Sequence, residues 1–114
     1  MITAKLVLEG GLLKSCRISG HANAGPKGTD IVCAAVTVLG RTVCKVLSEK
    51  KGIKTVCILP ERGELQLDIV SADPECIGFL AGAGTFLLEG LLSVTKEYPG
   101  NFTVIIERSE DNGS

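Results

Sequence analysis

Residues 2–19, ITAKLVLEGGLLKSCRIS, decide the fold of this chain, because two alternating segments flank a pair of glycines. Apolar and polar residues alternate from Ile2 to Leu8, which is typical of a strand with one buried face. The glycines at positions 10–11 turn the chain, and residues 12–19 return with Cys16 on the apolar face. We therefore expect a β-hairpin at the start of a sheet.

A helix is expected after each of two hairpins. Apolar residues at spacings of three and four predict the first helix, and Asp73-Pro74-Glu75 supplies an N-cap, a first-position proline and a first-turn acid for the second. The predicted helices are residues 29–52 and 74–98, and the predicted strands are residues 2–8, 12–19, 53–59, 64–70 and 102–106. This ββαββαβ order indicates an α/β (α+β) fold in which two helices pack on one mixed sheet.

The length of the chain limits it to one domain. It has 114 residues, of which 45% are hydrophobic and 22% are charged, as in an ordinary globular protein. We expect a single domain at residues 1–108 and a polar, disordered tail at residues 109–114. A chain of this size buries only about two-thirds of the surface that it exposes when unfolded, so burial shared with a second copy would stabilise it.

Charge and hydropathy argue against two kinds of partner. Twelve basic and thirteen acidic side chains give a net charge of -1, without the positive excess that binding to nucleic acid requires. The apolar run at residues 76–92 is shorter than the roughly 20 residues needed to cross a bilayer and contains Glu89, so we expect a core helix and no membrane span. Gly78, Gly82 and Gly84 should let this helix pack closely against the first helix or the sheet.

Cysteine usage indicates a reducing compartment. The number of cysteines is odd and we expect no signal peptide before them, so a disulfide framework does not fit. No two cysteines have the close Cys-x-x-Cys spacing of a structural zinc site, and we expect neither a metal nor a cofactor. The protein should therefore be cytoplasmic, with most thiols acting as small buried apolar groups. The five cysteines are Cys16, Cys33, Cys44, Cys57 and Cys76.

The one histidine and one of the cysteines flank a strand–loop–helix junction. His21 follows the second predicted strand, and Cys33 lies in the expected first turn of the first helix, which Thr29 or Asp30 can cap. A helix N-terminus favours a thiolate by about 0.3 to 1 kcal/mol and at most about 2, whereas lowering a thiol pKa from about 8.5 to about 5 requires about 5 kcal/mol. Only His21 could supply the remainder and then donate a proton to a leaving amine.

The same two residues also have a purely structural interpretation. Cys33 would then be a core thiol, and His21 a hydrogen-bonded residue at the end of a strand. Strict alternation places His21 on the face of Ser19 and away from Cys16, although a rotation of the chain at Gly20 would remove that objection.

A nucleotide-binding loop is a further alternative for residues 20–29, GHANAGPKGT, which approach the Gly-x-x-x-x-Gly-Lys-Ser/Thr pattern. Pro26 interrupts the Gly-Lys pair and removes a backbone N–H donor, and Gly28 separates Lys27 from the hydroxyl residue. We therefore disfavour a nucleotide site.

Residues 20–22, Gly-His-Ala, a glycine-bearing loop, and then residues 30–36, DIVCAAV, followed by Thr37, closely resemble the ribosomal-processing cysteine protease family, Prp. The resemblance extends over the whole chain in length and element order. It implies that His21 and Cys33 form the catalytic pair. It also implies a homodimer whose substrate is the precursor of a large-subunit bacterial ribosomal protein, the twenty-seventh. The family removes a short N-terminal extension from that precursor by cutting after aromatic residues.

The resemblance further implies supporting roles around the catalytic pair. The family has a flexible loop from Ala22 to Gly28, in which Asn23–Pro26 replace its usual aromatic and acidic residues, so contacts to substrate should differ. Thr37 stands where the family often has serine, and its hydroxyl could reach the thiol or the substrate or bond its own backbone, which we favour. Asp30 is either a cap, which we favour, or a partner for His21. The supporting or substrate-loop residues are Gly20, Ala22, Gly25, Gly28, Asp30 and Thr37.

Together these residues predict a cysteine endopeptidase. Cys33 would attack the scissile carbonyl to form an acyl-enzyme, and His21 would act first as acid and then as base. Backbone N–H groups around Cys33 are expected to bind the oxyanion. Two alternatives stay open: a thiol-dependent hydrolase acting on another acyl substrate, and a non-catalytic binding module in ribosome assembly.

Overall fold

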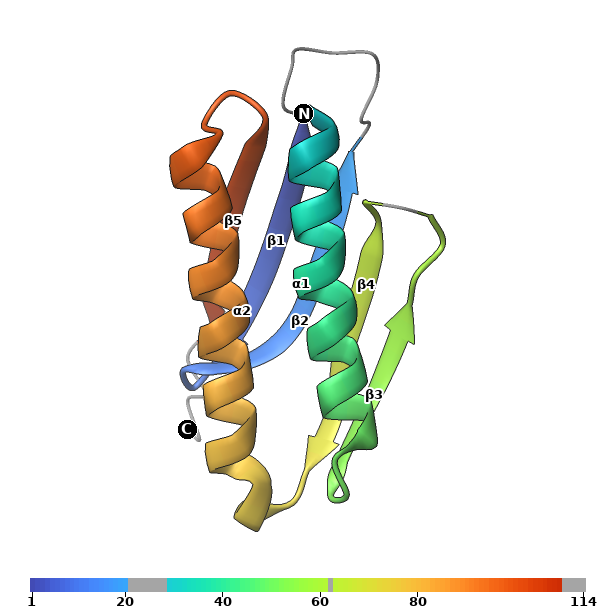
Figure 1. Ribbon diagram of the computed structural model, residues 1–114. Helices are drawn as coiled ribbons and strands as arrows, with labels where there is room; N and C mark the ends of the chain where they lie inside the picture. The colour runs from blue at the N-terminus through green and yellow to red at the C-terminus, as the bar shows by residue number, and fades with distance from the viewer. Residues whose placement is uncertain (21–28, 62, 110–114) are drawn as a thin grey trace.

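The computed structural model describes residues 1–20, 29–61 and 63–109, and Figure 1 shows its strands and helices. The strands are β1 (Ile2–Glu9), β2 (Leu12–Gly20), β3 (Ile53–Ile58), β4 (Leu65–Ala72) and β5 (Phe102–Ser109). The helices are α1 (Thr29–Glu49) and α2 (Ile77–Glu97), and the 3-10 helix η1 (Pro74–Cys76) leads into α2. This order confirms the predicted ββαββαβ arrangement and the α+β class.

The five strands form one mixed sheet in the order β3-β4-β2-β1-β5. The pairs β1–β2, β2–β4 and β3–β4 are antiparallel. β5 instead runs parallel to β1, from Phe102 opposite Ile2 to Ser109 opposite Glu9. A parallel pair needs a long crossover, and here the crossover contains both helices and the second hairpin.

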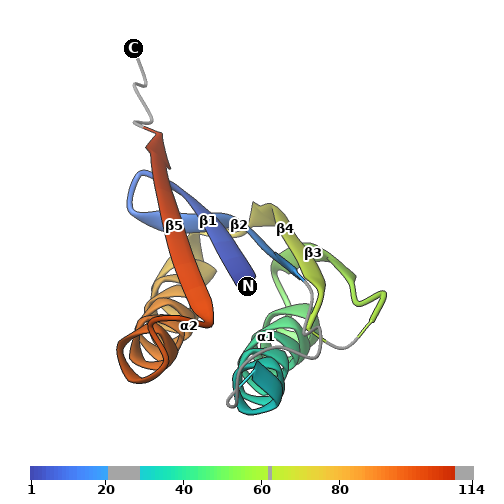
Figure 2. The ribbon, with the colours of Figure 1, turned by 90° about the horizontal axis from the view of Figure 1, so that it is seen from above.

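Both helices cover the same face of the sheet, as Figures 1 and 2 show. α1 packs over β3 and β4, whereas α2 packs over β2 and β5, and the two helices also contact each other. In β1 every second residue from Ile2 to Leu8 is buried, and Phe102 at the start of β5 is fully buried. Removing this apolar surface from water is the main contribution that holds the two layers together.

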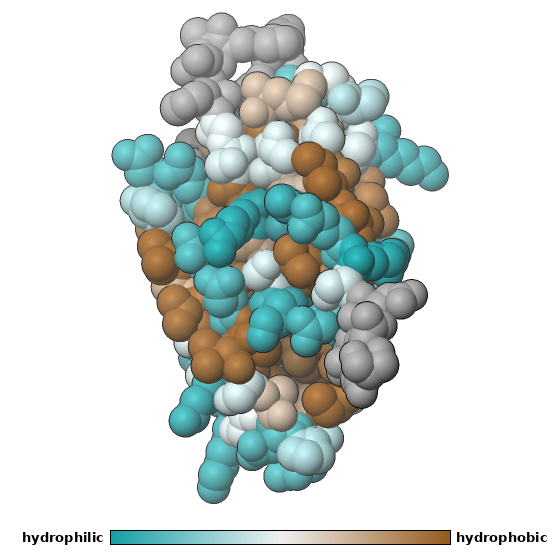
Figure 3. All heavy atoms as spheres, turned by 180° about the vertical axis from the view of Figure 1, so that it is seen from behind, coloured by the Kyte–Doolittle hydropathy of each residue, from teal (hydrophilic) through white to brown (hydrophobic). Residues whose placement is uncertain are grey.

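The opposite face of the sheet carries no helix in the described part of the chain. Figure 3 shows this face from behind, with hydrophilic residues across its middle and hydrophobic residues between them. Lys5 Nζ lies 3.0 Å from Glu107 Oε1 across β1 and β5, and Arg17 lies 3.6 Å from Asp68 across β2 and β4. Exposed ion pairs of this kind contribute little to stability, so they mark a solvated face.

Two helical segments, residues 31–49 and 74–97, are long and apolar enough to cross a membrane by length and composition. The prediction excluded a span at residues 76–92 partly because of length, and that reason fails because the second segment covers 24 residues. The buried leucines of α2, which are Leu80, Leu87 and Leu91, pack in the core beneath the sheet. Core packing therefore accounts for part of the hydropathy of α2.

Only one of the three glycines singled out in α2 packs closely. A Cβ at Gly84 would lie 3.1 Å from Leu13 Cβ, so this glycine lets α2 approach β2. A Cβ at Gly78 or Gly82 would meet no described atom within 4 Å, and both residues lie on the exposed side of α2, so the prediction is wrong for them. Close contact with α1 is made at Gly90, where a Cβ would lie 2.9 Å from a leucine methyl group.

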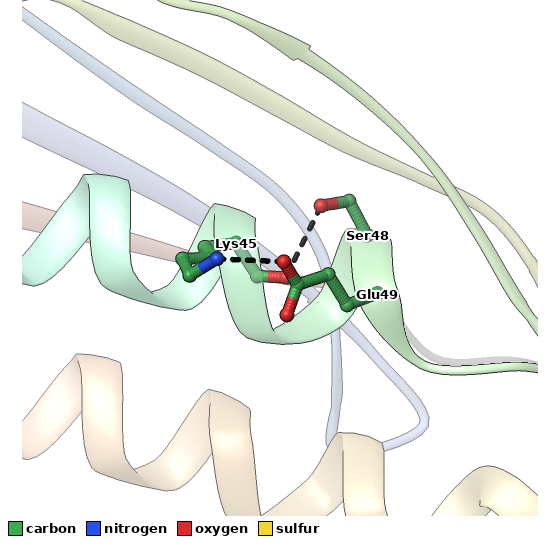
Figure 4. Close-up of polar contacts among 3 residues, drawn as sticks. All are labelled: Lys45, Ser48 and Glu49. Carbon is green, nitrogen blue, oxygen red and sulfur yellow. Dashed lines mark hydrogen bonds and ion pairs between the residues drawn. The ribbon is translucent and has the colours of Figure 1, made fainter.

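The C-terminal end of α1 is polar and exposed. Lys45 Nζ donates to Glu49 Oε2 at 2.6 Å, and Ser48 Oγ donates to the carbonyl of Lys45 at 3.1 Å (Figure 4). The hydrogen bond to Glu49 and its negative charge raise the pKa of Lys45. α1 ends at Glu49, and the turn that follows contains Gly52 with φ +97°. The polar contacts at this end of the helix are exposed to solvent, and the chain then leads into β3.

Two further predicted details differ from the structure. Asp73 occupies the N-cap position of η1 in an extended conformation, but its side chain makes no capping hydrogen bond. Its backbone carbonyl accepts from Cys76 N–H at 2.8 Å instead, because η1 is a single tight 3-10 turn. Ser109 belongs to β5 and not to the tail, and residues 110–114 lie outside the described residues.

Candidate active site

Cys33 lies beyond the first turn of α1. The helix begins at Thr29, so Cys33 is its fifth residue and the predicted first-turn position is wrong. The unpaired N–H groups of an α-helix are the first four, and the effect of the helix dipole fades within the first turn. The helix N-terminus therefore contributes less to a Cys33 thiolate than the sequence suggested. A helical Cβ tilts towards the N-terminus, which directs the thiol back over the first turn.

The thiol of Cys33 lies against the β3–β4 turn, which the structure describes at residues 59–61 and 63–64. Gly63 in this turn is buried and has φ +83°. An ideal Cβ on Gly63 would lie 2.8 Å from Cys33 Sγ, so the space beside the sulfur admits only the hydrogen atoms of glycine. Cys33 itself is 3% exposed. The β3–β4 turn thus forms part of the enclosure around the thiol.

Thr37 links the turn to the helix. Its hydroxyl donates to the carbonyl oxygen of Cys33 at 2.6 Å and accepts from the N–H of Gly63 at 3.0 Å. The first bond is the backbone role predicted for Thr37, in which the side chain bonds the carbonyl four residues earlier. The second bond was not predicted. Through it a single hydroxyl holds the β3–β4 turn to the helical turn that carries Cys33.

Most of the predicted loop residues lie outside the described part of the chain. They are His21, Ala22, Gly25 and Gly28, together with the atypical residues 23–26. The prediction for the Asp30 side chain also falls outside what the structure describes. Gly20 is described, and it ends β2 with φ +130°. A Cβ there would clash with the backbone oxygen of Met1. Alternation therefore stops at Gly20, and it does not determine the face of the residue that follows.

Three of the other four thiols, those of Cys16, Cys44 and Cys76, are buried or hydrogen-bonded in ways that disfavour nucleophilic attack. Burial raises the pKa of Cys16 to about 12, and burial together with a hydrogen bond to Cys57 raises the pKa of Cys44. Cys76 Sγ donates to the carbonyl of Lys51 at 3.3 Å. All five cysteines are free thiols. Because the thiolate is the reactive form, Cys16 and Cys44 are poor nucleophiles near neutral pH.

Two hollows adjoin the β3–β4 turn. The first is a cavity of about 10 Å³ beside Thr37 and Gly63, which has room for at most one water molecule. The second, of about 260 Å³, opens between β2 and the turn and is lined by Arg17 and Pro60 among others. Of these two hollows, only the second has room for a substrate side chain.

Gly63 is the residue of the candidate site that the sequence analysis missed. In the sequence it is only the glycine that ends the turn Pro60–Gly63, and a turn glycine carries no information about a thiol thirty positions away. Thr37 was found because a residue four positions after Cys33 lies on the same side of a helix. Helical spacing could therefore predict the hydrogen bond from Thr37 to the carbonyl of Cys33, but not the one from Gly63 to Thr37.

Solved structures with the same fold include three whose sequences are distant from this chain. SMU.848 from Streptococcus mutans has a TM-score of 0.77 and 24% sequence identity, and the match covers 96% of this chain and 96% of that chain. The essential ribosomal processing protease Prp from S. aureus has TM-scores of 0.75 with a covalently linked product peptide and 0.77 with a substrate peptide. Those two matches have 20% and 16% identity and cover 94% of this chain and 100% of that chain. At these identities the likeness shows the fold alone.

The family to which the chain belongs follows from its sequence profile. No curated protein matches the chain. The profile described as "Cysteine protease Prp" matches residues 1–103, which reach from β1 into β5. This match confirms the resemblance carried by residues 20–37. The chain belongs to the Prp family of cysteine proteases.

Proposed function

We propose that the protein removes a short N-terminal extension from the precursor of a large-subunit bacterial ribosomal protein, the twenty-seventh. Membership of the Prp family supports the cysteine protease activity. The S. aureus relative of the same fold is named a ribosomal processing protease and has been solved with a substrate peptide. The observation that carries the proposal to this chain is the place of Cys33, near the start of α1 and joined through Thr37 to the β3–β4 turn.

In the proposed mechanism Cys33 is the nucleophile and His21 is its proton partner. The thiolate sulfur attacks the scissile carbonyl carbon, and the imidazolium of His21 donates its proton to the nitrogen of the leaving amine as the C–N bond breaks. A thioester remains on Cys33. The neutral imidazole then takes a proton from a water molecule, whose oxygen attacks the thioester and releases the carboxylate product.

The start of α1 is proposed to stabilise the oxyanion. The N–H groups of residues 29–31 precede the first hydrogen bonds within the helix, and the Cys33 side chain leans back towards them. The N–H of Cys33 itself belongs to the second turn, so the predicted donors are refined to the residues before it. One donor of this kind contributes about 10²- to 10³-fold to kcat.

Cleavage of the organism's own precursor ribosomal protein tests the proposal directly. Wild-type protein should shorten the precursor at its N-terminus, as measured by mass spectrometry. Cys33→Ala should abolish cleavage, and His21→Ala should lower kcat by about 10²- to 10⁴-fold, because proton transfer to the amine is lost. Cys57→Ala is the matched control, since Cys57 is a partly exposed thiol outside the candidate site. No cleavage by wild type, or equal cleavage by Cys33→Ala, would refute the assignment.

The two alternatives are separated from the proposal by thiol reactivity. A thiol hydrolase acting on another acyl substrate would show fast alkylation of Cys33 without cleavage of the precursor. A non-catalytic assembly module would show slow and similar alkylation at all five cysteines with neutral iodoacetamide. The proposed protease combines fast alkylation at Cys33 with cleavage.

We also propose that the protein is a homodimer that uses the outer face of the helices. Leu80, Leu87 and Leu91 of α2 are buried in the core of the monomer, so they do not contribute to this face. Phe79 and Phe86 remain exposed, and they line an apolar groove of about 380 Å³ between α1 and α2. A chain of this length gains stability by sharing such a surface with a second copy.

Sedimentation tests the dimer and its face. Wild type should sediment as twice 11.9 kDa at micromolar concentration, and Phe86→Lys should shift it towards the monomer. Phe86 is 62% exposed, and the matched control is Val70→Lys, because Val70 is 57% exposed on the opposite face of the molecule. A monomeric wild type contradicts the dimer, and a dimeric Phe86→Lys contradicts the face.

We propose that the protein acts in the cytoplasm, without a cofactor and without binding nucleic acid or a membrane. Five free thiols support a reducing compartment, and a net charge of -1 disfavours a polyanionic partner. The core packing of α1 and α2 supports their role as helices of a globular domain. Fractionation of native cells should place the protein in the soluble fraction, and recovery with membranes would contradict this proposal.

A further inference from the structure

The β3–β4 turn contacts the proposed nucleophile through a residue that no motif assigns. A Cβ on Gly63 would lie 2.8 Å from Cys33 Sγ, a separation that real Cβ atoms essentially never reach. Apart from the chain neighbours of Gly63, this sulfur is the only described atom within 4 Å of that Cβ position. The space that a side chain would occupy at position 63 is therefore the space of the thiol.

The backbone of Gly63 is held at this place by a hydrogen bond. Its N–H donates to Thr37 Oγ1 at 3.0 Å, and the same hydroxyl donates to the carbonyl of Cys33 at 2.6 Å. Both capacities of the hydroxyl, as donor and as acceptor, are thereby used on the two segments that meet at the thiol. A shift of the turn would strain this pair of bonds, so the distance between Gly63 and Cys33 is constrained.

The conformation of the turn adds a second requirement for glycine. Gly63 has φ +83°, a region in which L side chains are disfavoured. Gly11, in the β1–β2 turn, has the similar value of φ +80°, but a Cβ there would meet no described atom within 4 Å. A side chain at either glycine would therefore cause similar backbone strain, but only a side chain at Gly63 would also contact a thiol.

We propose that Gly63 is a positioning residue for the Cys33 nucleophile. Its bare Cα limits where the sulfur can lie, and the bond to Thr37 keeps that Cα in place. This inference rests on the proposed role of Cys33 and extends it to a segment outside the family motif at residues 20–37. A glycine here both leaves room for the sulfur and confines it, which favours one orientation towards the substrate.

Replacement of the glycine by alanine tests the proposal. Gly63→Ala should lower kcat for precursor cleavage by about 10²-fold, the effect of displacing a reacting atom by about 1 Å, with little change in KM. The second-order rate of Cys33 alkylation by iodoacetamide should fall by about tenfold or more, because the sulfur is displaced from its position in the site. Site-resolved mass spectrometry distinguishes Cys33 from the other thiols.

Gly11→Ala is the matched control, because it introduces the same backbone strain without touching a thiol. It should leave the alkylation rate of Cys33 and kcat within about twofold of wild type while lowering stability. Equal changes in Cys33 alkylation in Gly63→Ala and Gly11→Ala would mean that Gly63 only forms a turn, and the proposal would be wrong.

A second pair of variants covers the case in which Gly63→Ala does not fold. Thr37→Val keeps the shape of the side chain and removes the anchor of the Gly63 N–H, so it should also slow alkylation of Cys33 and lower kcat. Thr37→Ser restores the hydroxyl and should recover most of both rates. Wild-type alkylation rates in Thr37→Val would overturn the proposal. Failure of wild type to cleave the precursor refutes the protease proposal alone, since the alkylation comparison needs no protease activity.

Discussion

Two turns of this molecule place a glycine against a cysteine thiol. Gly52, in the turn after α1, has φ +97°, and a Cβ there would lie 2.7 Å from Cys76 Sγ. Gly63, in the β3–β4 turn, has φ +83°, and a Cβ there would lie 2.8 Å from Cys33 Sγ. The two contacts with sulfur are similar in φ and in distance, although a Cβ on Gly52 would also lie 3.0 Å from Asp73 Oδ2. They therefore compare a glycine against a thiol in two different settings.

The difference lies in the hydrogen bonds of the two thiols. Cys76 Sγ donates to the carbonyl of Lys51, which ties the sulfur to the turn that contains Gly52. Cys33 Sγ makes no hydrogen bond to another described residue, and the Thr37 hydroxyl holds the surrounding backbone instead. Packing of a glycine against a thiol is therefore not sufficient evidence of an active site, because it also occurs at the hydrogen-bonded Cys76. It becomes a candidate active site where the sulfur stays available to a proton partner.

Removal of Cys33 should affect cleavage, whereas removal of Cys76 should affect stability. This is the largest difference that the comparison predicts. Cys33→Ala should abolish precursor cleavage, whereas Cys76→Ala should leave cleavage within about threefold of wild type and lower the free energy of unfolding by about 1 to 3 kcal/mol. Cleavage assays and urea titrations measure the two quantities. Loss of cleavage in folded Cys76→Ala would remove the distinction between the two turns.

Alanine at the two structural glycines should separate backbone strain from contact with a thiol. Gly11→Ala and Gly52→Ala both force a side chain into the left-handed region, but only Gly52→Ala also presses on Cys76 Sγ and, less closely, on the side chain of Asp73. Urea titrations should show an additional loss of about 1 to 3 kcal/mol for Gly52→Ala. Cys33 alkylation should be unchanged in both variants. A similar loss in both would show that the thiol contact has no measurable cost.

The last expected effect is confined to alkaline pH, where the buried core thiols should cause a loss of stability. Burial raises the pKa of Cys16 in the folded protein from 9.0 to about 12. The unfolded chain therefore releases a proton near pH 9 that the folded chain retains, so this contribution to stability is present below about pH 9 and is lost as pH rises towards about 12. Urea titrations between about pH 8 and 11 should show the decline. Cys16→Ala should make it shallower, and an unchanged slope would contradict this cause.

Local patterns were sufficient for the elements and for one hydrogen bond of the candidate site. Alternation and helical spacing predicted every strand and both helices, because each depends on neighbours a few residues apart. Helical spacing also predicted the backbone bond of Thr37, whereas it left Cys33 open between a nucleophile and a core thiol until the family resemblance was considered. They failed for Gly78 and Gly82, because a glycine in an apolar helix can face the sheet or the solvent, and only the packing of the helix decides which.

Long-range contacts were beyond these patterns for the same physical reason. The parallel pairing of β1 with β5 joins residues about a hundred positions apart, and periodicity within a strand does not name its partner. The contact of Gly63 with Cys33 likewise depends on how the second hairpin lies across α1.

The sequence by itself determined the order of the elements, which depends on residue types at short spacing, and the family of the chain, whose resemblance implies Cys33 as the nucleophile. Only the tertiary structure decided which turn glycine rests beside which buried thiol, and that Thr37 holds the turn beside Cys33. That choice depends on the docking of a β-hairpin against a helix, which is governed by burial of apolar surface over the whole domain and by no single motif.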